Sequence, residues 1–382
     1  MEKIKYWLIQ FKSFTVKRKA LYASFFLGAF LTGALVSYLV LGISGMFVKT
    51  GSESAQEQTP LDTTPPQNAY NILLLGYGGA GHDGGTLSDS IIVANIIPGE
   101  KKVTLISIPR DLWVEIPVRS DMNQNFKINH AYAIGLNDTL YPLKEPQYKG
   151  EGGGATMAKE VVGEVVGMPI DFFLAVDFEG LKNIVDELGR VEVDVPVTCD
   201  DYFYPIKGAE NDICGKSASE IARLHEQYSD TALHHQFECR YEHIHFDQGS
   251  TQMNGDTALK FTRSRASAQH GGDFARSERQ HAVLAGIKDK ALSIYSIGKI
   301  DEIFNQFADM VRTDLDLPTI KNLAQILGSP QDYQIKYIGV SDENVLVATQ
   351  SFDGQFILIP KEGEGVWVGV QSFIYGQINA GN

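Results

Sequence analysis

The hydrophobic pattern of this 382-residue chain begins with one long uncharged stretch. Residues 20–48 contain no charged side chain, and residues 20–42 are mostly apolar or small. At about 1.5 Å per residue, a helix over residues 20–42 is roughly 34 Å long, enough to cross a bilayer. A secretory signal has a shorter apolar core of about 7–15 residues. The pattern therefore predicts a transmembrane helix in residues 20–48.

The flanks of this stretch predict its orientation. Lys17, Arg18 and Lys19 precede it, whereas only Lys49 follows closely. Because positive residues favour the cytoplasmic side, we expect residues 1–19 to be a cytoplasmic basic tail and the main domain to be extracellular. Residues 49–69 are rich in Ser, Thr, Gln and Pro and predict a flexible linker. We expect a single-pass protein of the cell membrane.

From residue 70 onward, short apolar strands alternate with helical patterns. A continuous apolar run marks the first strand, and a four-residue turn joins the next two as an antiparallel hairpin. Strands are predicted at residues 71–75, 90–97, 102–108, 172–178 and 191–197, and helices at residues 156–166 and 179–188. This alternation predicts an α/β fold with a mixed sheet and helices on both faces.

The second half of the chain continues the same domain, which we place at residues 70–382. Helices are predicted at residues 254–260, 276–294, 301–311 and 319–327, and strands at residues 333–340, 345–348 and 356–360. The apolar stretch that ends at Ile378 is expected to close the sheet.

Residues 199–245 interrupt the alternation and predict a surface insertion. The three cysteines, Cys199, Cys214 and Cys239, all lie there or at its border, so at most one pair forms within the chain. Cys199–Cys214 closes the shorter loop and is the expected disulfide, with Cys214–Cys239 as the alternative. His243 and His245 would share a strand face, but the histidine spacings match no standard metal motif, so we favour an insertion without a metal.

The net charge of the chain restricts the classes of partner that it can bind. The net charge is −14, and after the first 19 residues the chain holds 27 basic against 46 acidic side chains. Such an acidic domain repels a phosphate backbone, so no nucleic-acid partner is expected.

Against this background, residues 261–280 contain a cluster of arginines. Arg263 and Arg265 would point the same way in an extended segment, while Arg276, Arg279 and Gln280 share one face of a helix. Guanidinium groups bind phosphate oxygens through planar paired donors. The cluster therefore predicts an anion-binding site rather than a solvated basic surface.

Carboxylates are expected near the same site. A glycine-rich loop at residues 76–85 follows the first strand and contains Asp83, and Asp89 opens the next strand. Two carboxylates beside a phosphate would hold Mg²⁺, although on spacing alone the same residues could cap turns. Arg110 and Asp111 follow the third strand and should reach the same sheet edge as Asp89, because a hairpin joins the two strands. Lys127 adds an ammonium group from a segment that we expect to be a loop.

Together these segments resemble the LytR-CpsA-Psr family of cell-envelope proteins. The resemblance covers roughly residues 71–290 and rests on residues 71–76, 88–91, 103–111, 127–129, 253–259, 263–265, 273–276 and 279–280. It implies an α/β/α sandwich with an apolar pocket for a polyprenyl tail.

The resemblance also implies site residues. The pyrophosphate-binding positions it implies are Arg110, Lys127, Arg263, Arg265, Arg276, Arg279 and Gln280. It implies Mg²⁺ binding by Asp89. The family usually has an Asp and an Arg where this chain has Gly78 and Ala80, and often an Arg where it has Leu87. Asp83 is then the candidate for the second metal ligand.

The implied activity is Mg²⁺-dependent transfer of a phosphoglycopolymer from a polyprenyl-pyrophosphate carrier to a peptidoglycan hydroxyl. Asp89, Arg110 and Asp111 would be catalytic, and either carboxylate could accept the hydroxyl proton. The alternative is a membrane-tethered protein that binds polyprenyl phosphate or an anionic glycopolymer without catalysis.

Overall fold

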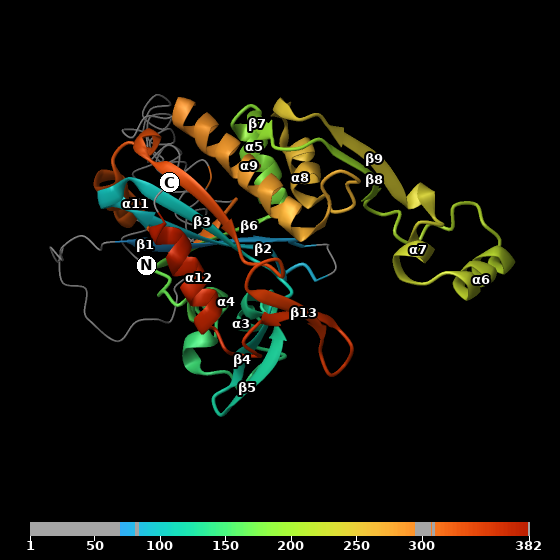
Figure 1. The fold of residues 1–382 in the computed structure, drawn as a ribbon, viewed down its shortest axis with the longest axis horizontal. Coiled ribbons are helices and arrows are strands. Elements are labelled where there is room, and N and C mark those ends of the chain that lie inside the picture. The colour runs from blue at the N-terminus through green and yellow to red at the C-terminus, as the bar shows by residue number, and fades with distance from the viewer. Residues whose placement is uncertain (1–68, 81–83, 295–306, 308–309, 381–382) are drawn as a thin grey trace, which may run out of the picture. The chain divides into compact units, whose positions relative to one another are not determined.

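The computed structural model describes residues 69–80, 84–294, 307 and 310–380 (Figure 1). Within these residues, no helix is both long and apolar enough to span a membrane. The predicted transmembrane helix at residues 20–48 lies outside the described residues, as do most of the predicted linker and of the helix at 301–311.

A six-stranded mixed sheet forms the centre of the domain, in the order β11-β6-β1-β2-β3-β12. Strand β1 pairs in parallel with β6 and antiparallel with β2, and β3 pairs antiparallel with β2 and in parallel with β12. The strands are β1 (Tyr70–Tyr77), β2 (Ser88–Ile97), β3 (Lys102–Ile108), β6 (Phe172–Asp177), β11 (Arg312–Thr313) and β12 (Gln334–Gly339). The predicted hairpin and mixed sheet are confirmed.

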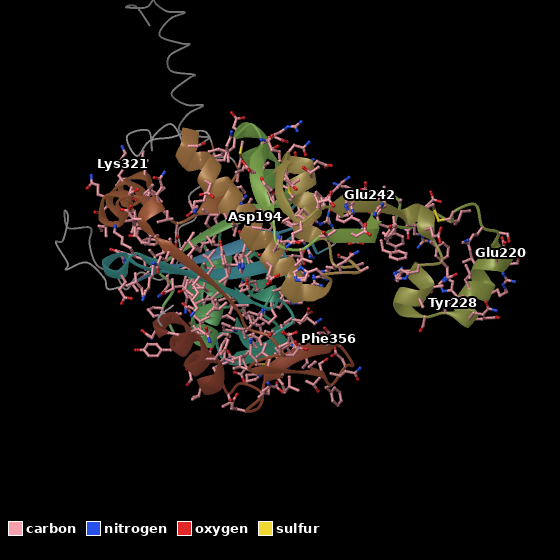
Figure 2. The ribbon with its side chains drawn as sticks, turned by 45° about the horizontal axis from the view of Figure 1, so that its top comes forward. Asp194, Glu220, Tyr228, Glu242, Lys321 and Phe356 are labelled. Carbon is pink, nitrogen blue, oxygen red and sulfur yellow. A yellow bond between two sulfur atoms is a disulfide. The ribbon has the colours of Figure 1, made fainter. Side chains whose placement is uncertain are left out.

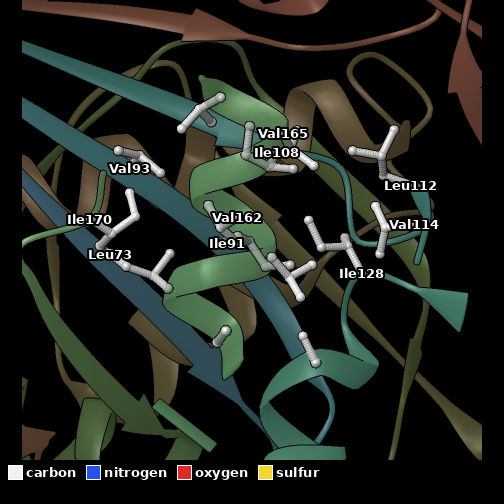
Figure 3. Close-up of a cluster of buried hydrophobic side chains, with 14 of the residues drawn as sticks. Leu73, Ile91, Val93, Ile108, Leu112, Val114, Ile128, Val162, Val165 and Ile170 are labelled. Atoms are coloured by element: carbon white, nitrogen blue, oxygen red, sulfur yellow. The ribbon is translucent and has the colours of Figure 1, made fainter. Parts of the chain in front are cut away.

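One face of the sheet packs against α4 (Gly153–Val166), with α3 (His130–Leu136) beside it. Val162 and Val165 of α4 lie over apolar side chains of the sheet such as Leu73 and Val93, all of them buried (Figure 3). These strand residues alternate with side chains on the opposite face, as the pleat requires.

The C-terminal segment corrects one prediction. It forms a helix, α12 (Val368–Asn379), which packs beside α4 and adds no strand to the sheet. Val370, Ile374 and Ile378 are its buried residues, and they recur every four positions. That spacing places them on one side of a helix, so this apolar segment has the periodicity of a helix and not of a strand.

The second face of the sheet carries α5 (Phe178–Glu187), α8 (Gly255–Arg263) and α9 (Gly272–Ile294), which lie together above the sheet in Figure 1. They share a second apolar core with the separate ladder β7 (Val191–Val195) and β10 (Gly249–Met253). Helix α9 starts four residues earlier than predicted, so Asp273 lies inside it.

Three further pieces complete the domain. A hairpin of β4 (Trp113–Arg119) and β5 (Met122–Lys127) occupies a segment expected to be partly loop. A second hairpin joins β13 (Leu346–Gln350) and β14 (Phe356–Pro360), and α11 (Leu317–Leu327) is capped by the side chain of Asp316.

The insertion forms a projecting arm of β8 (Cys199–Pro205) and β9 (Tyr241–Phe246) with α6 (Ala218–Gln227) and α7 (Asp230–His234) at its tip (Figure 2). The disulfide is Cys214–Cys239, with its Cα atoms 5.5 Å apart, so the favoured Cys199–Cys214 pairing is wrong and the alternative is correct. Cys199 opens β8 inside the second apolar core and is a buried free thiol.

Candidate functional site

The sheet topology brings the ends of four strands together at one end of the sheet, here called the sheet edge. Strands β1 and β6 end there because they are parallel, β2 begins there, and β3 ends there. Asp89 lies at the start of β2 and Arg110 follows β3, and Nη1 of Arg110 donates to Oδ1 of Asp89 over 2.5 Å. The hairpin thus places this pair as predicted.

The ion pairs continue beyond Arg110. Nε of Arg110 lies 3.5 Å from Oδ2 of Asp111, and Nζ of Lys127 donates to Oδ1 of Asp111 over 2.7 Å. Lys127 reaches this position because it ends β5, which pairs with the start of β4 just after Asp111. Asp111 therefore contacts two cations, one through each carboxylate oxygen, whereas Asp89 contacts one.

Helix α9 is fastened to this edge by polar contacts with the sheet. Ser90, the residue after Asp89 in β2, donates to Gln280 over 2.8 Å, and His281 forms a 2.9 Å hydrogen bond with Ser107 of β3. His281 also stacks on Tyr337. Burial lowers the pKa of His281 to about 4, so its imidazole is neutral at pH 7.

These contacts involve residues that sequence reasoning missed. Ser90 and Ser107 are small polar side chains on the α9 face of the sheet, and His281 follows Gln280 on the helix. Ser107 stands between Ile106 and Ile108, and this polar position in an apolar run was the available signal.

Arg279 does not lie in the environment that we expect for a pyrophosphate-binding arginine. It is almost fully buried, and its guanidinium donates to the backbone carbonyls of Phe261, Ser264 and His270. These carbonyls belong to the last turn of α8, to its C-cap and to the end of the loop that follows it. Arg279 thus holds that loop in place from α9.

The other arginines are spread around the loop. Arg263 is the last residue of α8, so the expected extended arrangement with Arg265 is not formed. Its guanidinium lies 4.4 Å from the centre of the Phe178 ring, next to the carboxyl end of β6, and contacts the Tyr204 hydroxyl over 3.4 Å. Arg265 is exposed on the loop, and Arg276 is buried one turn before Gln280.

The loop after β1 passes close to the end of β6. Gly79 has φ +81°, and a Cβ atom there would lie 2.9 Å from the carboxylate of Asp177, so a larger residue does not fit. Burial and the Asp177 charge raise the pKa of Tyr77, and a hydrogen bond from Arg312 opposes them. Arg312, which sequence reasoning missed, therefore adds a guanidinium at this edge. Asp83 lies outside the described residues.

The fold and site define a class: mixed α/β domains that gather carboxylates and several guanidinium groups at one sheet edge, an arrangement suited to phosphate groups. The LytR_cpsA_psr family model matches residues 39–359. The chain belongs to this family.

Two relatives are both named polyisoprenyl-teichoic acid–peptidoglycan teichoic acid transferase TagU. The protein from Enterococcus faecalis is 28% identical over 279 residues, covering 72% of this chain and 70% of its own. The protein from Oceanobacillus iheyensis is 28% identical over 311 residues, covering 77% and 79%.

Solved structures share the fold. The crystal structure of TagV from Bacillus subtilis superimposes with a TM-score of 0.53 at 23% identity, covering 83% of this chain and all of the other. The structure of TagT bound to LI-WTA gives a TM-score of 0.51 at 19% identity, covering 84% and 94%.

Proposed function

We propose that this protein is a transferase that moves a phosphoglycopolymer from a polyprenyl-pyrophosphate carrier to a hydroxyl of peptidoglycan. Family membership and the names of the relatives support the reaction class. The observation that carries the proposal is the direct Asp89–Arg110 pair at the strand edge, which continues through Asp111 to Lys127. A membrane anchor in residues 20–48 would keep this domain near a lipid-borne donor.

The cationic side chains would bind the diphosphate. Arg110 follows β3, Arg263 lies next to the carboxyl end of β6, and Arg312 is hydrogen-bonded to Tyr77 at the end of β1. Asp111 positions Arg110 and Lys127 through its two ion pairs. Planar guanidinium groups are suited to paired phosphate oxygens, so the arrangement can offset the charge of a diphosphate.

Asp89 fits Mg²⁺ in its donor chemistry. Its Oδ1 accepts from Arg110, and among the described residues its second carboxylate oxygen has no hydrogen-bond partner. Mg²⁺ prefers such hard oxygen ligands together with phosphate oxygens, and Asp83 would be the second ligand. When bound, the ion would neutralise charge on the diphosphate.

In the proposed step, a sugar hydroxyl oxygen forms a bond to the glycan-linked phosphorus. The bond from that phosphorus to the bridging oxygen breaks, and polyprenyl phosphate leaves with the electron pair. A carboxylate accepts the hydroxyl proton. Asp89 suits this role better than Asp111, because Asp89 is the more exposed of the two and contacts one cation where Asp111 contacts two.

The lipid tail would lie between the sheet and α9. Leu74 and Leu105, on central strands, face the α9 side of the sheet and are only half-buried, unlike their neighbours toward α4. A cavity of about 390 Å³ instead lies at the opposite sheet edge, lined by Lys159, Ile170 and neighbouring residues, and does not adjoin Asp89. The α9 face therefore suits an apolar chain that starts at the diphosphate.

The test is product release from a polyprenyl-pyrophosphate-linked glycan, followed by mass spectrometry. We expect polyprenyl phosphate and a phosphate-linked glycan on the acceptor, with activity lost on chelation and restored by Mg²⁺. Binding without product under Mg²⁺, Mn²⁺ or Ca²⁺ would support the alternative of a non-catalytic binder.

A further inference from the structure

A second cluster of ligand-type side chains lies at the base of the arm, away from Asp89. His243 and His245 point from one face of β9, and Asp200 lies directly opposite His245 on β8. One oxygen of Asp200 lies 2.5 Å from Nε2 of His243 and 3.1 Å from Nδ1 of His245. The three potential ligand atoms all lie within 4.8 Å of one another.

The surroundings fix the orientation of each side chain. The ring of His243 stacks on Tyr202 with centroids 3.9 Å apart and an angle of 4° between the planes. The Nε2 atom of His245 faces Oδ1 of Asp247 over 3.1 Å. The backbone of Asp200 is held by Ser267 and Ala268, which lie on the loop after α8. The cluster is therefore ordered by its neighbours.

His245 has a carboxylate oxygen at each ring nitrogen, Oδ1 of Asp200 at Nδ1 and Oδ1 of Asp247 at Nε2. A neutral imidazole carries a single N–H, so it can donate to only one of the two carboxylates. A metal ion bound at Nδ1 would occupy the other position while Nε2–H donates to Asp247.

We propose that His243 Nε2, His245 Nδ1 and the Asp200 carboxylate form a Zn²⁺ site, with water at the fourth position. Imidazole and carboxylate are suitable zinc ligands at about 2.0–2.2 Å, which separates ligands of a tetrahedral site by roughly 3.3 Å. The Asp200 oxygen lies 2.5 and 3.1 Å from the two imidazole nitrogens, and all three atoms lie within 4.8 Å of one another, so the separations are compatible with this value.

Asp247 would support the metal-bound form of His245 from its other ring nitrogen. It would accept a hydrogen bond from Nε2 of His245 while Nδ1 binds the metal, which is the common carboxylate–histidine–zinc arrangement. The other cluster on the arm, Asp212 with Cys214 and Cys239, differs because both sulfurs form the disulfide. The ion would join β8 and β9 at the point where Asp200 also contacts the loop that carries Arg265.

The experiment titrates the metal-free full-length protein with Zn²⁺ in competition with a chromophoric chelator. The oxidised disulfide is kept, and Mg²⁺ is present in excess to occupy hard-oxygen sites. His243→Ala and His245→Ala each remove one ligand, and His225→Ala is the matched control because it removes an exposed histidine of α6 on the same arm. Asp247→Asn removes only the carboxylate that orients His245.

We expect one Zn²⁺ per chain, a loss of at least about a hundredfold in affinity for each ligand variant, and about tenfold for Asp247→Asn. His225→Ala should bind as the native protein does. X-ray absorption of the zinc complex should show two imidazole ligands. Equal affinity in the native protein and the two ligand variants, or no stoichiometric binding by a native protein of normal circular dichroism, would overturn the proposal.

Discussion

Asp89 and Asp111 are two carboxylates at the same sheet edge, and their neighbours separate their roles. Asp111 is held by Arg110 and Lys127, whereas Asp89 is more exposed and shares only Arg110. The sequence indicated that both residues reach the edge, because hairpin geometry requires it. The sequence could not show which cation pairs with which carboxylate, since these ion pairs depend on side-chain positions set by the β4–β5 hairpin.

Arg279 leads to the first prediction. Its guanidinium donates to three backbone carbonyls in a buried position, and a replacement leaves these acceptors without a donor. Arg279→Ala should lower the free energy of unfolding by about 3 kcal/mol or more, measured by urea denaturation.

Arg265→Ala is the matched control, because Arg265 is exposed on the loop that Arg279 holds. It should change stability by less than about 0.5 kcal/mol. Equal destabilisation by both substitutions would contradict the assignment of Arg279 to positioning the loop.

His281 predicts a pH dependence of stability. Its pKa is about 4 in the folded protein and 6.5 in the ordinary state, so between these values the unfolded chain binds the extra proton. Stability should therefore decrease as the pH falls from 6.5 to 4, by about 3 kcal/mol from this residue.

His281→Gln does not titrate and can still bond to Ser107. Its stability should depend less on pH in this window, as measured by denaturation at several pH values. If the free energy of unfolding had the same pH dependence in the native protein and in the variant, the role of His281 would be refuted.

At the level of elements, apolar periodicity predicted what lies in the core. The apolar runs of the sequence predicted strand β1, the β2–β3 hairpin, α4 and α5, and the structure forms each of these elements. The segment that forms the arm was predicted to be a surface insertion, and its disulfide was misassigned, because loop length does not reveal that Cys199 enters the core at the start of β8. The β4–β5 hairpin was missed because β5 has few apolar residues.

The disulfide should control the stability of the arm. Cys214 and Cys239 are separated by 25 residues, and closing a loop of that length stabilises by about 3 kcal/mol. A Cys214→Ser, Cys239→Ser variant should be cleaved in the arm roughly a hundredfold faster in limited proteolysis.

Reductant provides the control for this experiment. It should accelerate cleavage of the native arm and have no further effect on the double variant. Unchanged cleavage after reduction would show that α6 and α7 are held by other contacts.

Across the described domain, the proposed site combines two layers of the fold at one sheet edge. The sheet supplies Asp89 and Arg110, and the α8–α9 layer supplies Arg263 and Gln280. The motif order allowed the family to be identified from the sequence, and the family model confirms it. Arg279 and Arg312 show the limit of motif reasoning, because only packing reveals which arginine supports the backbone and which reaches the edge.

We propose that Asp89 acts in the chemical step and that Arg110 and Lys127 bind the diphosphate. The most direct measurement compares Asp89→Asn with Asp121→Asn for both turnover and binding of a polyprenyl-pyrophosphate-linked glycan. Asp121 is the matched control, since it is an exposed carboxylate paired with Arg119 on the β4–β5 hairpin. We expect Asp89→Asn to lose at least about a hundredfold in turnover while its affinity for the donor changes less than tenfold, and Asp121→Asn to match the native protein. Full turnover by Asp89→Asn would contradict the account.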